Sequence, residues 1–590
     1  MAANWTELNG GDDDEVALRR AIAMSLGDAL PDEVSGPSDV DRPEKDSQVG
    51  SSPVTASVSA TNSMAAIGLD RKKMEEERLA RSRKRKADAG SAPAAPAASR
   101  PRLDGSSTGL TQLSNQMTAP SPNSMSRSAY QGSSGLPKAS PPGPLSYPRG
   151  TVLKTWARGR PREDDITIEE IFQKDDLDLA VLSSFQWDED WLMSKLDMRR
   201  TKVLLIAYAK DDTQKAEMRN NVPQDVIRFV FPPMDSVAGC MHSKLQLLKY
   251  KDFLRIVVPT GNLVAYDWGE TGTMENMVFL IDLPLIQDPT KQPINGTLTP
   301  FGEELCFFLQ AQGVDDKMIS SLRKYDFAET SRYGFVHTIA GSHSEPDLWH
   351  RTGYCGLGRT VTTLGLDSRD DIDLDYVCSS IGAVKLDLLA ALYYAAQGDS
   401  GTKEIETRTA RAKRSKDATV SVVDQIDLAR IRIYFPSRDT VLRSRGGSNS
   451  AGTIRFQSKW WNAASFPRQI LRDCKNVRSG VLMHSKILFV RHKLSSRGWA
   501  YVGSHNLSES AWGRLVKDRT GKLKLNARNW ECGVVVVATS SPAPSKGTTR
   551  GTRGAAEDLD VFRNSVPIPM ELPALPYRGD ERQPWFADEA

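Results

Sequence analysis

Met241-His242-Ser243-Lys244 and Met483-His484-Ser485-Lys486 are identical tetrapeptides, and their recurrence organises most of this chain of 590 residues. A short apolar run follows each tetrapeptide, over residues 245–248 in the first case and 487–490 in the second. Runs of this length are typical of buried β-strands. The chain contains 7 histidines, and two of them hold the same place in this repeat.

Two further features recur downstream at similar distances. Gly261-Asn262-Leu263 follows the first tetrapeptide, and His505-Asn506-Leu507 follows the second. Six residues after each asparagine stands a Trp-Gly pair, Trp268-Gly269 and Trp512-Gly513. An ordered set of matches that occurs twice predicts two homologous half-domains. We expect the two tryptophans to fix the turn after each asparagine by packing, without a part in the chemistry.

The sequence pattern from residue 151 onwards predicts an α/β fold. Strand-like runs at residues 203–207, 254–258 and 431–435 alternate with helical stretches at 301–312 and 384–396. Such alternation favours a mostly parallel or mixed sheet flanked by helices. We therefore predict two pseudo-symmetric halves, at residues 151–385 and 386–590.

Two low-complexity breaks, at residues 398–419 and 540–556, are predicted to be surface insertions.

Composition excludes several classes of protein. The formal net charge is only +3, so a nucleic acid would have to be held by a local basic patch. The 6 cysteines are scattered without a Cys-x-x-Cys pair, which argues against a zinc knuckle or a disulfide framework. The first ten residues do not form a signal peptide, and the apolar runs are too short to cross a bilayer. We expect a soluble intracellular protein with no membrane partner.

Residues 1–150 are rich in Ser, Pro, Ala and Gly, and this composition predicts a disordered tail. Within it, residues 12–28 combine an acidic cluster with apolar and small residues at helical spacing. This pattern resembles a ubiquitin-interacting motif, and an incidental amphipathic helix explains it equally well. Residues 70–86 form a dense basic block. Its last basic cluster exceeds its acidic neighbours, which favours nuclear import over a salt-bridged helix.

The repeated residues suit chemistry on a phosphate. His and Lys two positions apart on a strand project from one face. If the halves pair, two Lys and two Asn surround one point and stabilise phosphate oxygens without a metal or other cofactor. One imidazole then attacks phosphorus while the other protonates the leaving oxygen. These roles predict environments that push the two pKa values apart. A lone histidine would more often be structural, but the repeated set makes that interpretation weak.

The twofold His-x-Lys arrangement resembles the phospholipase D superfamily. Most of that superfamily has an Asp soon after the Lys, whereas here the later Asn262 and Asn506 take its place. This departure, over about 440 C-terminal residues, resembles the tyrosyl-DNA phosphodiesterase family. Further segments support the resemblance: Gly503-Ser504-His505-Asn506-Leu507-Ser508, Asn529-Trp530-Glu531-Cys532-Gly533-Val534, Val566-Pro567-Ile568-Pro569 and Gln583-Pro584-Trp585.

The resemblance implies a role for each histidine. His242 is the nucleophile that forms a covalent phosphohistidine with the DNA 3′ end. His484 is the general acid that protonates the departing tyrosine and then the base that activates water. The product is a DNA 3′-phosphate, and the partner is DNA that carries a tyrosyl-peptide adduct at its 3′ end. We expect the protein to act as a monomer in the nucleus.

The resemblance also implies the supporting residues. The phosphate oxygens are bound by Lys244, Lys486, Asn262 and Asn506. Glu531 orients one imidazole, which we expect to be that of His242. The family's second orienting residue, a Gln after the first Trp, has no clean match, and Asn276 is the candidate for this role.

Contacts to the rest of the DNA are less sharply marked by the sequence. Ser437, Ser444 and Ser448 are candidates to donate hydrogen bonds to phosphates. Arg468, Arg472 and Lys475 extend this track, although a solvated loop explains each one nearly as well. The family places a base-stacking aromatic just before the first His motif, but residues 236–241 contain none.

Two alternatives remain open at this stage. One is another phosphodiesterase of the same superfamily, a nuclease or a lipase, although no interfacial amphipathic segment is evident for lipid work. The other is an inactive ubiquitin-binding scaffold. That alternative predicts a lost His or Lys in one half, and both halves are intact.

Overall fold

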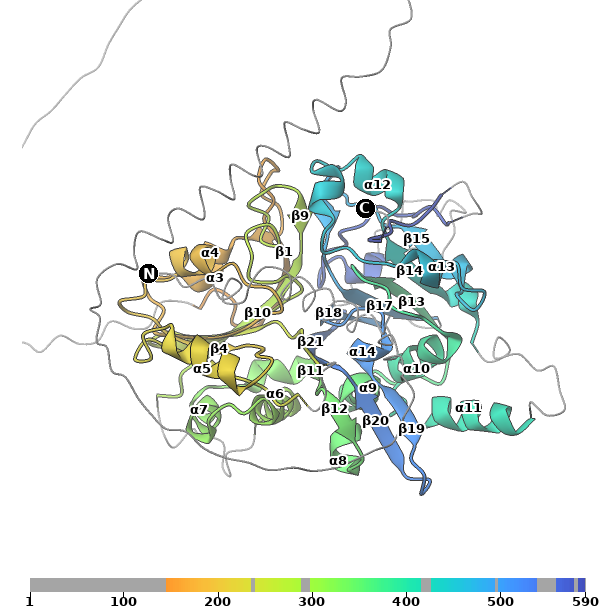
Figure 1. The fold of residues 1–590 in the computed structure, drawn as a ribbon, viewed down its shortest axis with the longest axis horizontal. Helices are drawn as coiled ribbons and strands as arrows, with labels where there is room; N and C mark the ends of the chain where they lie inside the picture. Colours follow the sequence, from red (N-terminus) through yellow and green to blue (C-terminus); the bar gives the residue numbers. More distant parts are fainter. Residues whose placement is uncertain are drawn as a thin grey trace, which may run out of the picture. The chain divides into compact units, whose positions relative to one another are not determined.

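The structure is a computed structural model that describes residues 145–234, 239–287, 298–414, 426–493, 497–538, 559–577 and 582–588. Side chains are described in these ranges except at residues 411–414. The motifs predicted at residues 12–28 and 70–86, and the insertion predicted at 540–556, lie outside the described residues. Figure 1 shows two mixed sheets flanked by helices, which confirms the predicted α/β class.

The first sheet runs in the order β2-β1-β10-β8-β7-β3-β4-β5. Its strands are β1 (Thr151–Thr155), β2 (Asp165–Ile166), β3 (Leu179–Ser183), β4 (Lys202–Ile206), β5 (Ile227–Val230), β7 (Leu245–Lys249), β8 (Phe253–Pro259) and β10 (Met277–Pro284). The helices among these strands are α3 (Ile168–Phe172), α4 (Glu189–Ser194) and α5 (Asp212–Asn220).

The second sheet runs in the order β11-β21-β18-β17-β13-β14-β15. Its strands are β11 (Tyr333–Thr338), β13 (Ile372–Val377), β14 (Ile431–Phe435), β15 (Leu471–Asp473), β17 (Ile487–His492), β18 (Gly498–Gly503) and β21 (Asn529–Val537). The helices between β10 and β21 are α6 (Pro300–Ala311), α7 (Asp316–Ser321), α8 (Pro346–Trp349), α9 (Gly353–Thr363), α10 (Leu386–Ala396), α11 (Thr402–Arg414), α12 (Arg438–Leu442), α13 (Ser458–Trp461) and α14 (Glu509–Trp512).

The two sheets share one topology. The order β10-β8-β7-β3-β4-β5 in the first sheet matches β21-β18-β17-β13-β14-β15 in the second. The directions match as well. Both sheets have two parallel pairs at one end, followed by three antiparallel pairs. This correspondence confirms the two pseudo-symmetric halves inferred from the repeated tetrapeptides.

The change from one sheet to the other comes earlier than residue 385. β11 and β13 precede that residue, yet they belong to the second sheet because they pair with β21, β14 and β17. The boundary therefore falls between β10, which ends at Pro284, and β11, which begins at Tyr333. The predicted boundary was wrong because it was placed at the helix α10, which covers the second sheet and does not begin it.

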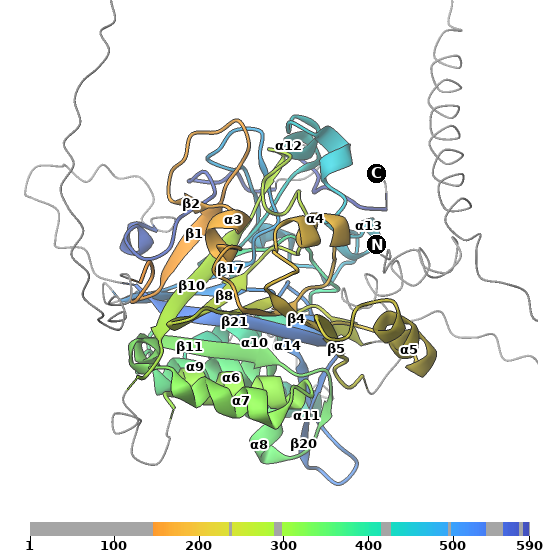
Figure 2. The same ribbon diagram turned by 90° about the vertical axis from the view of Figure 1, so that its left-hand side faces the viewer.

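The sheets meet through strands that are buried along almost their whole length. Ile256 and Phe279 from the first sheet and Phe489 and Val502 from the second belong to one buried apolar cluster. Figure 2 shows β8 lying against β21, and β10 contacts β18. Burying each such side chain contributes roughly 1.5–3 kcal/mol. This shared core holds the halves together, so that the segments that precede β7 and β17 can contribute to a common site.

Part of the predicted insertion at 398–419 is helical. α11 begins at Thr402, and Ile405 is buried against the same cluster as α10. Glu404 is also buried, and it forms an ion pair with Arg408 at 2.6 Å. A buried residue and a paired charge on one face explain why this polar stretch orders as a helix. No helix among the described residues is long and apolar enough to span a bilayer.

Candidate active site

Each repeated tetrapeptide begins on a short strand that pairs with the opposite half. β6 (Cys240–Met241) pairs in parallel with β21, and the His242 N–H donates to the carbonyl of Trp530 at 3.0 Å. β16 (Leu482–Met483) pairs in parallel with β9 (Met274–Glu275), and the His484 N–H donates to the carbonyl of Glu275 at 3.1 Å. Each half therefore pairs one short strand with the other half directly before its histidine. Both histidines lie in extended junctions between strands, and not within a strand as predicted.

The two lysines are fully buried and are held by backbone carbonyls. Lys244 Nζ donates to the carbonyl of His242 at 2.8 Å, and Lys486 Nζ donates to that of His484 at 2.6 Å. Lys486 also reaches Thr260 O in the opposite half, at 3.4 Å. Burial lowers the pKa of both lysines, and the nearby charge of Lys244 lowers the pKa of Lys486 further. Two buried cations that repel each other form a site that an anion would stabilise.

Glu531 holds His242 from behind. Its Oε2 lies 2.7 Å from His242 Nδ1 and also accepts from the Ser504 hydroxyl, while its Oε1 accepts from Asn529 Nδ2 at 2.8 Å. Burial acts to raise the pKa of Glu531, but His242 and Lys244 outweigh it and lower this pKa to about 2. Because an ionised carboxylate only accepts, Nδ1 of His242 carries the hydrogen. Nε2 then keeps its lone pair.

The side chain that approaches His484 is the carboxylate of Asp267. Asn276, which the sequence predicted to orient the second imidazole, does not take this place. Asp267 Oδ2 lies 3.2 Å from His484 Nδ1, at ion-pair distance but without the alignment of a hydrogen bond. The same oxygen accepts from the Asn262 N–H at 2.7 Å. Burial acts to raise the pKa of Asp267, but His484 and its other donors lower it.

Asn276 occupies the position in the first half that Glu531 occupies in the second. Its Oδ1 accepts from the Thr260 hydroxyl at 2.8 Å, as Glu531 accepts from Ser504. Its Nδ2, however, donates to the carbonyl of Asp267 at 2.9 Å and so supports the residue that approaches His484. The missed signal was Asp267 itself, a carboxylate directly before Trp268 within the repeated block.

Each of the two repeated asparagines has a hydrogen-bonding partner that orients its side chain. Asn506 Oδ1 accepts from Ser379 Oγ at 3.2 Å and from the Ser380 N–H at 3.1 Å. Its Nδ2 is thereby turned away from these groups. Asn262 Nδ2 lies 3.3 Å from Gln186 Oε1. Ser379, Ser380 and Gln186 follow β13 and β3, which are equivalent strands, so topology brings them to the site although the sequence analysis did not single them out.

An aromatic ring lies beside His242 despite the absence of one in residues 236–241. Phe185, in the segment after β3, packs against the His242 ring with centroids 5.3 Å apart and an angle of 52° between the planes. Phe185 is partly exposed. It therefore offers a surface for a base or another ring, and only the fold reveals it, because it lies far from His242 in the sequence.

The two repeated tryptophans are buried packing elements. Trp268 Nε1 donates to the carbonyl of Asn262 at 2.9 Å, which closes the turn after that asparagine. Trp512 Nε1 donates to the Tyr376 hydroxyl at 3.0 Å. Both indoles are almost completely shielded from solvent.

Burial lowers the pKa of both imidazoles to a similar value. Burial lowers the pKa of His242 to about 4, against the opposing charge of Glu531. Burial also lowers the pKa of His484 to about 4, against the opposing charge of Asp267. The prediction that the environments separate the two pKa values is therefore wrong for the protein without substrate, because burial dominates at both rings.

For two of the serines predicted to contact DNA, the prediction was wrong. Ser437 is buried, and its hydroxyl caps α12 and donates to Asp473 Oδ2 at 3.0 Å. The Ser444 hydroxyl is also shielded from solvent. These side chains face inward because the chain folds back into a short helix and turn at this point. Ser448 is exposed and stays a candidate.

The basic residues predicted to extend the DNA track are placed differently from one another. Arg468 Nε donates to the carbonyl of Trp461 at 3.0 Å, and Arg472 donates to the carbonyls of Gln469 and Leu471. Lys475 is exposed. Arg468 and Lys475 are both exposed and stay candidates, whereas Arg472 is partly buried.

Comparison with known proteins identifies what the chain is similar to. The family model described as "Tyrosyl-DNA phosphodiesterase" matches residues 151–578. The proteins named tyrosyl-DNA phosphodiesterase 1 of Arabidopsis thaliana and Saccharomyces cerevisiae are each 23% identical to it, over 74% and 70% of this chain and 73% and 79% of their own lengths. The crystal structure of yeast tyrosyl-DNA phosphodiesterase matches with a TM-score of 0.51 at 18% identity, covering 74% of this chain and all of that one.

Proposed function

Because the chain belongs to the tyrosyl-DNA phosphodiesterase family, we propose that it removes tyrosine, or another adduct, from DNA 3′ phosphates during repair. The observation that carries this proposal is the pairing of two His-Lys sets across the halves, with a carboxylate beside each ring. Two buried cations form a seat for one phosphodiester, and two imidazoles are available to act on it.

In the first step, His242 Nε2 attacks the phosphorus. Glu531 supports this role because it holds the hydrogen on Nδ1 and stabilises the positive charge that develops on the ring. A P–N bond forms and the bond between phosphorus and the tyrosine oxygen breaks. His484 gives its proton to the departing phenolate. Although its pKa is about 4 in the free protein, the negative charge of a bound phosphodiester raises the protonated fraction.

In the second step, His484 is neutral and accepts a proton from water. The resulting hydroxide equivalent attacks phosphorus and breaks the P–N bond, which releases a DNA 3′-phosphate and restores His242. Asp267 supports this exchange because its charge lies 3.2 Å from His484 Nδ1 and favours the protonated ring.

The phosphate oxygens are bound by Lys244, Lys486, Asn262 and Asn506 in this proposal. The lysines supply charge, and the orientation of Asn506 by Ser379 and Ser380 leaves its Nδ2 to donate. Because the pKa of both lysines is lowered by burial, a bound anion stabilises their charged forms. Binding of the substrate and protonation of the two lysines are thus coupled.

The biological setting is also part of the proposal. The basic block at residues 70–86 suits import into the nucleus, where adducts on DNA arise. The segment at residues 12–28 is proposed to bind ubiquitin, with an incidental helix as its alternative. We further propose that the protein acts as a monomer, since all of the proposed catalytic groups come from one chain.

A single assay tests the proposed reaction. The protein is incubated with a 3′-tyrosyl oligonucleotide in the presence of EDTA, and the product is compared with an authentic 3′-phosphate. We expect release of tyrosine and a 3′-phosphate end without added metal. Inertness toward this substrate, together with turnover of phosphatidylcholine or of unmodified DNA, would instead support another phosphodiesterase of the phospholipase D superfamily.

A further inference from the structure

A basic hairpin extends from the second half of the candidate site. β19 (Arg514–Lys517) begins directly after the Trp512-Gly513 pair, and β20 (Leu523–Ala527) leads back to β21, which carries Glu531. β12 (Gly341–His343) pairs with β20 on its other side. Figure 1 shows β19 and β20 reaching away from the sheets beyond α8 and α11. Both ends of the hairpin are therefore anchored close to the proposed catalytic groups.

The hairpin carries an excess of positive charge. Between residues 514 and 528 the single acidic residue is Asp518, against these basic residues: Arg514, Lys517, Arg519, Lys522, Lys524 and Arg528. At the tip, Lys517, Arg519 and Lys522 are exposed. None of these three forms an ion pair with another described residue, although the charge of Lys522 contributes, after the hydrogen bond from Thr520, to the lowered pKa of Asp518.

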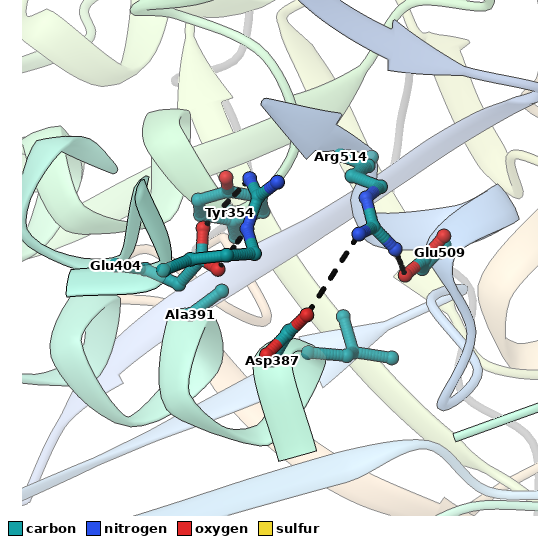
Figure 3. Close-up of a pocket in the computed structure, with 9 residues that line it drawn as sticks. Tyr354, Asp387, Ala391, Glu404, Glu509 and Arg514 are labelled. Atoms are coloured by element: carbon teal, nitrogen blue, oxygen red, sulfur yellow. Dashed lines mark hydrogen bonds and ion pairs between the residues drawn. The ribbon is translucent and has the colours of Figure 1, made fainter. Parts of the chain in front are cut away.

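The root of the hairpin, by contrast, is neutralised. Figure 3 shows Arg514 between two carboxylates, with Nη1 at 2.6 Å from Glu509 Oε1 and Nη2 at 3.7 Å from Asp387 Oδ2. In the same pocket Arg408 pairs with Glu404 at 2.6 Å. Arg514 and Arg408 are thus both paired with acidic residues at the root of the hairpin.

Hydrogen bonds to the backbone fix the direction of the hairpin. Arg408 Nη2 donates to the carbonyl of Leu515 at 2.6 Å, and the Leu515 N–H donates to the Tyr354 hydroxyl at 3.2 Å. Leu515 and Leu525, which pair across the strands, are fully buried. The root of the hairpin is therefore held in place by packing and by hydrogen bonds to its backbone.

The acidic residue at the tip serves the turn. Asp518 Oδ1 accepts from the Thr520 N–H at 2.8 Å, the Thr520 hydroxyl at 2.7 Å and the Lys522 N–H at 2.9 Å. Gly521 completes the turn with a φ of 85°, a conformation that favours glycine. A tight turn held in this way presents Lys517, Arg519 and Lys522 on a preorganised tip, which reduces the entropy cost of binding.

We propose that this tip binds backbone phosphates of the substrate DNA, upstream of the 3′ end held between the histidines. The partner is assigned as a polyanion because exposed cations are the chemical groups that the tip offers. Thr520 lies five positions after Leu515, and because the last of these positions are in the turn, the tip reaches at most roughly 17 Å beyond the root at about 3.4 Å per residue. That distance equals about five nucleotides at the spacing of a B-form strand.

The inference rests on the proposed function, since it assigns part of the same substrate. The test compares the variant Lys517→Gln/Arg519→Gln/Lys522→Gln with a control, Lys202→Gln/Lys210→Gln/Arg228→Gln, which removes the same number and kind of exposed charges from the β4–β5 side of the first sheet. Both variants and the wild type are assayed for release of tyrosine from 3′-tyrosyl oligonucleotides of about four and about twenty nucleotides at several salt concentrations, the shorter being too short to reach the tip. Thermal unfolding verifies that all three proteins are folded.

We expect the hairpin variant to lose roughly tenfold in kcat/KM on the long oligonucleotide, with the logarithmic salt slope reduced by about 2. On the short oligonucleotide it should match the wild type, and the control should match the wild type on both. An unchanged kcat/KM and salt slope on the long substrate would overturn the inference and assign the tip to another partner. Equal losses on both lengths would overturn it too. If the wild type releases no tyrosine from either substrate, it is the proposed function that fails.

Discussion

The two halves of the site are built on the same strands, yet they hold their histidines differently. His242 is joined to Glu531 by a short hydrogen bond of 2.7 Å, and that carboxylate comes from the opposite half. His484 is approached at 3.2 Å by Asp267, also from the opposite half, but without hydrogen-bond alignment. The two halves thus share one topology but differ in the carboxylates that contact the two imidazoles. This difference can give the two histidines different roles.

One pair of equivalent residues explains where the carboxylates stand. Gly261 precedes Asn262 in the first half, and a Cβ at this position would lie 2.9 Å from the amide of Asn276 and 3.2 Å from Asp267 Cβ. The glycine therefore makes room for Asp267.

The equivalent residue in the second half is His505. Its ring is hydrogen-bonded to the Tyr501 hydroxyl and lies 2.8 Å from Thr338 Oγ1, and it stacks on Trp512 with centroids 4.1 Å apart. This ring fills the space beside Trp512, and Ala511 stands where the first half has Asp267. The second half therefore supplies its carboxylate from β21 instead, as Glu531.

Replacing each histidine gives the largest expected effect. His242→Ala should lower the rate by about ten-thousandfold or more, without any covalent intermediate, because the proposed nucleophile is lost. His484→Ala should slow the second step most and let a DNA adduct accumulate. Denaturing gels with labelled 3′-tyrosyl DNA distinguish the two. An adduct with the His242 variant and none with the His484 variant would reverse the assignment of the halves.

Substitutions of the two carboxylates should differ in their effect on the rate of adduct formation. Glu531→Gln should reduce the rate of adduct formation by roughly a hundredfold, since it removes a charge hydrogen-bonded to the proposed nucleophile, whereas Asp267→Asn should reduce it by about tenfold. Single-turnover kinetics measure the first step directly, and thermal unfolding serves as the control for folding. Equal effects of the two variants on adduct formation would contradict the difference inferred from the two contacts.

Closing the space beside Asp267 should have a smaller effect. Gly261→Ala introduces a Cβ that must displace the Asn276 amide or Asp267, and we expect a loss of roughly tenfold in kcat, as is typical when an orienting residue shifts. Gly452→Ala is the matched control, because a Cβ there meets no atom within 4 Å. If the two alanine variants retain the same activity, Gly261 does not hold the position of Asp267.

Acid should weaken the folded state through the same two rings. An unfolded chain binds a proton at each histidine near pH 6.5, but the pKa values of His242 and His484 in the folded protein are about 4. Between these values the unfolded state binds more protons, so the free energy of unfolding falls as pH falls. Each ring contributes up to about a tenfold change in the folding equilibrium per pH unit.

Urea unfolding between about pH 7 and pH 5 measures this slope. The His484→Ala variant should show a shallower decline than the wild type, because one of the rings that resists protonation has been removed. An identical slope in the two proteins would show that the site histidines do not bring about the acid sensitivity.

Much of the architecture could be predicted because short stretches of sequence determine it. The repeated tetrapeptides and the apolar runs after them mark β7 and β17, and the repeat alone predicts two halves. The partner of His242 was also named, because Glu531 lies in a segment with a family resemblance. The contact itself places Glu531 beside the ring that the sequence analysis chose.

The remaining parts depend on folding between distant segments. Asn276 was chosen for its place after Trp268, and it does occupy the position equivalent to Glu531. Its side chain is nevertheless used to hold the backbone of Asp267. Ser437 shows the same limit, because a hydroxyl that caps a helix and one that faces DNA are identical in sequence. Phe185 reaches His242 only because β3 and β7 are adjacent in the sheet.

The most direct measurement maps the phosphorus in the trapped intermediate. The His484→Ala protein is mixed with 3′-tyrosyl DNA, digested under conditions that preserve phosphoramidates, and analysed by mass spectrometry. The account predicts a nucleotide attached to the peptide that contains His242, with the peptide that contains residue 484 unmodified. A nucleotide on any other residue, or rapid turnover with no adduct at all, would contradict the claim that the two halves supply one nucleophile and one proton carrier to a single phosphate.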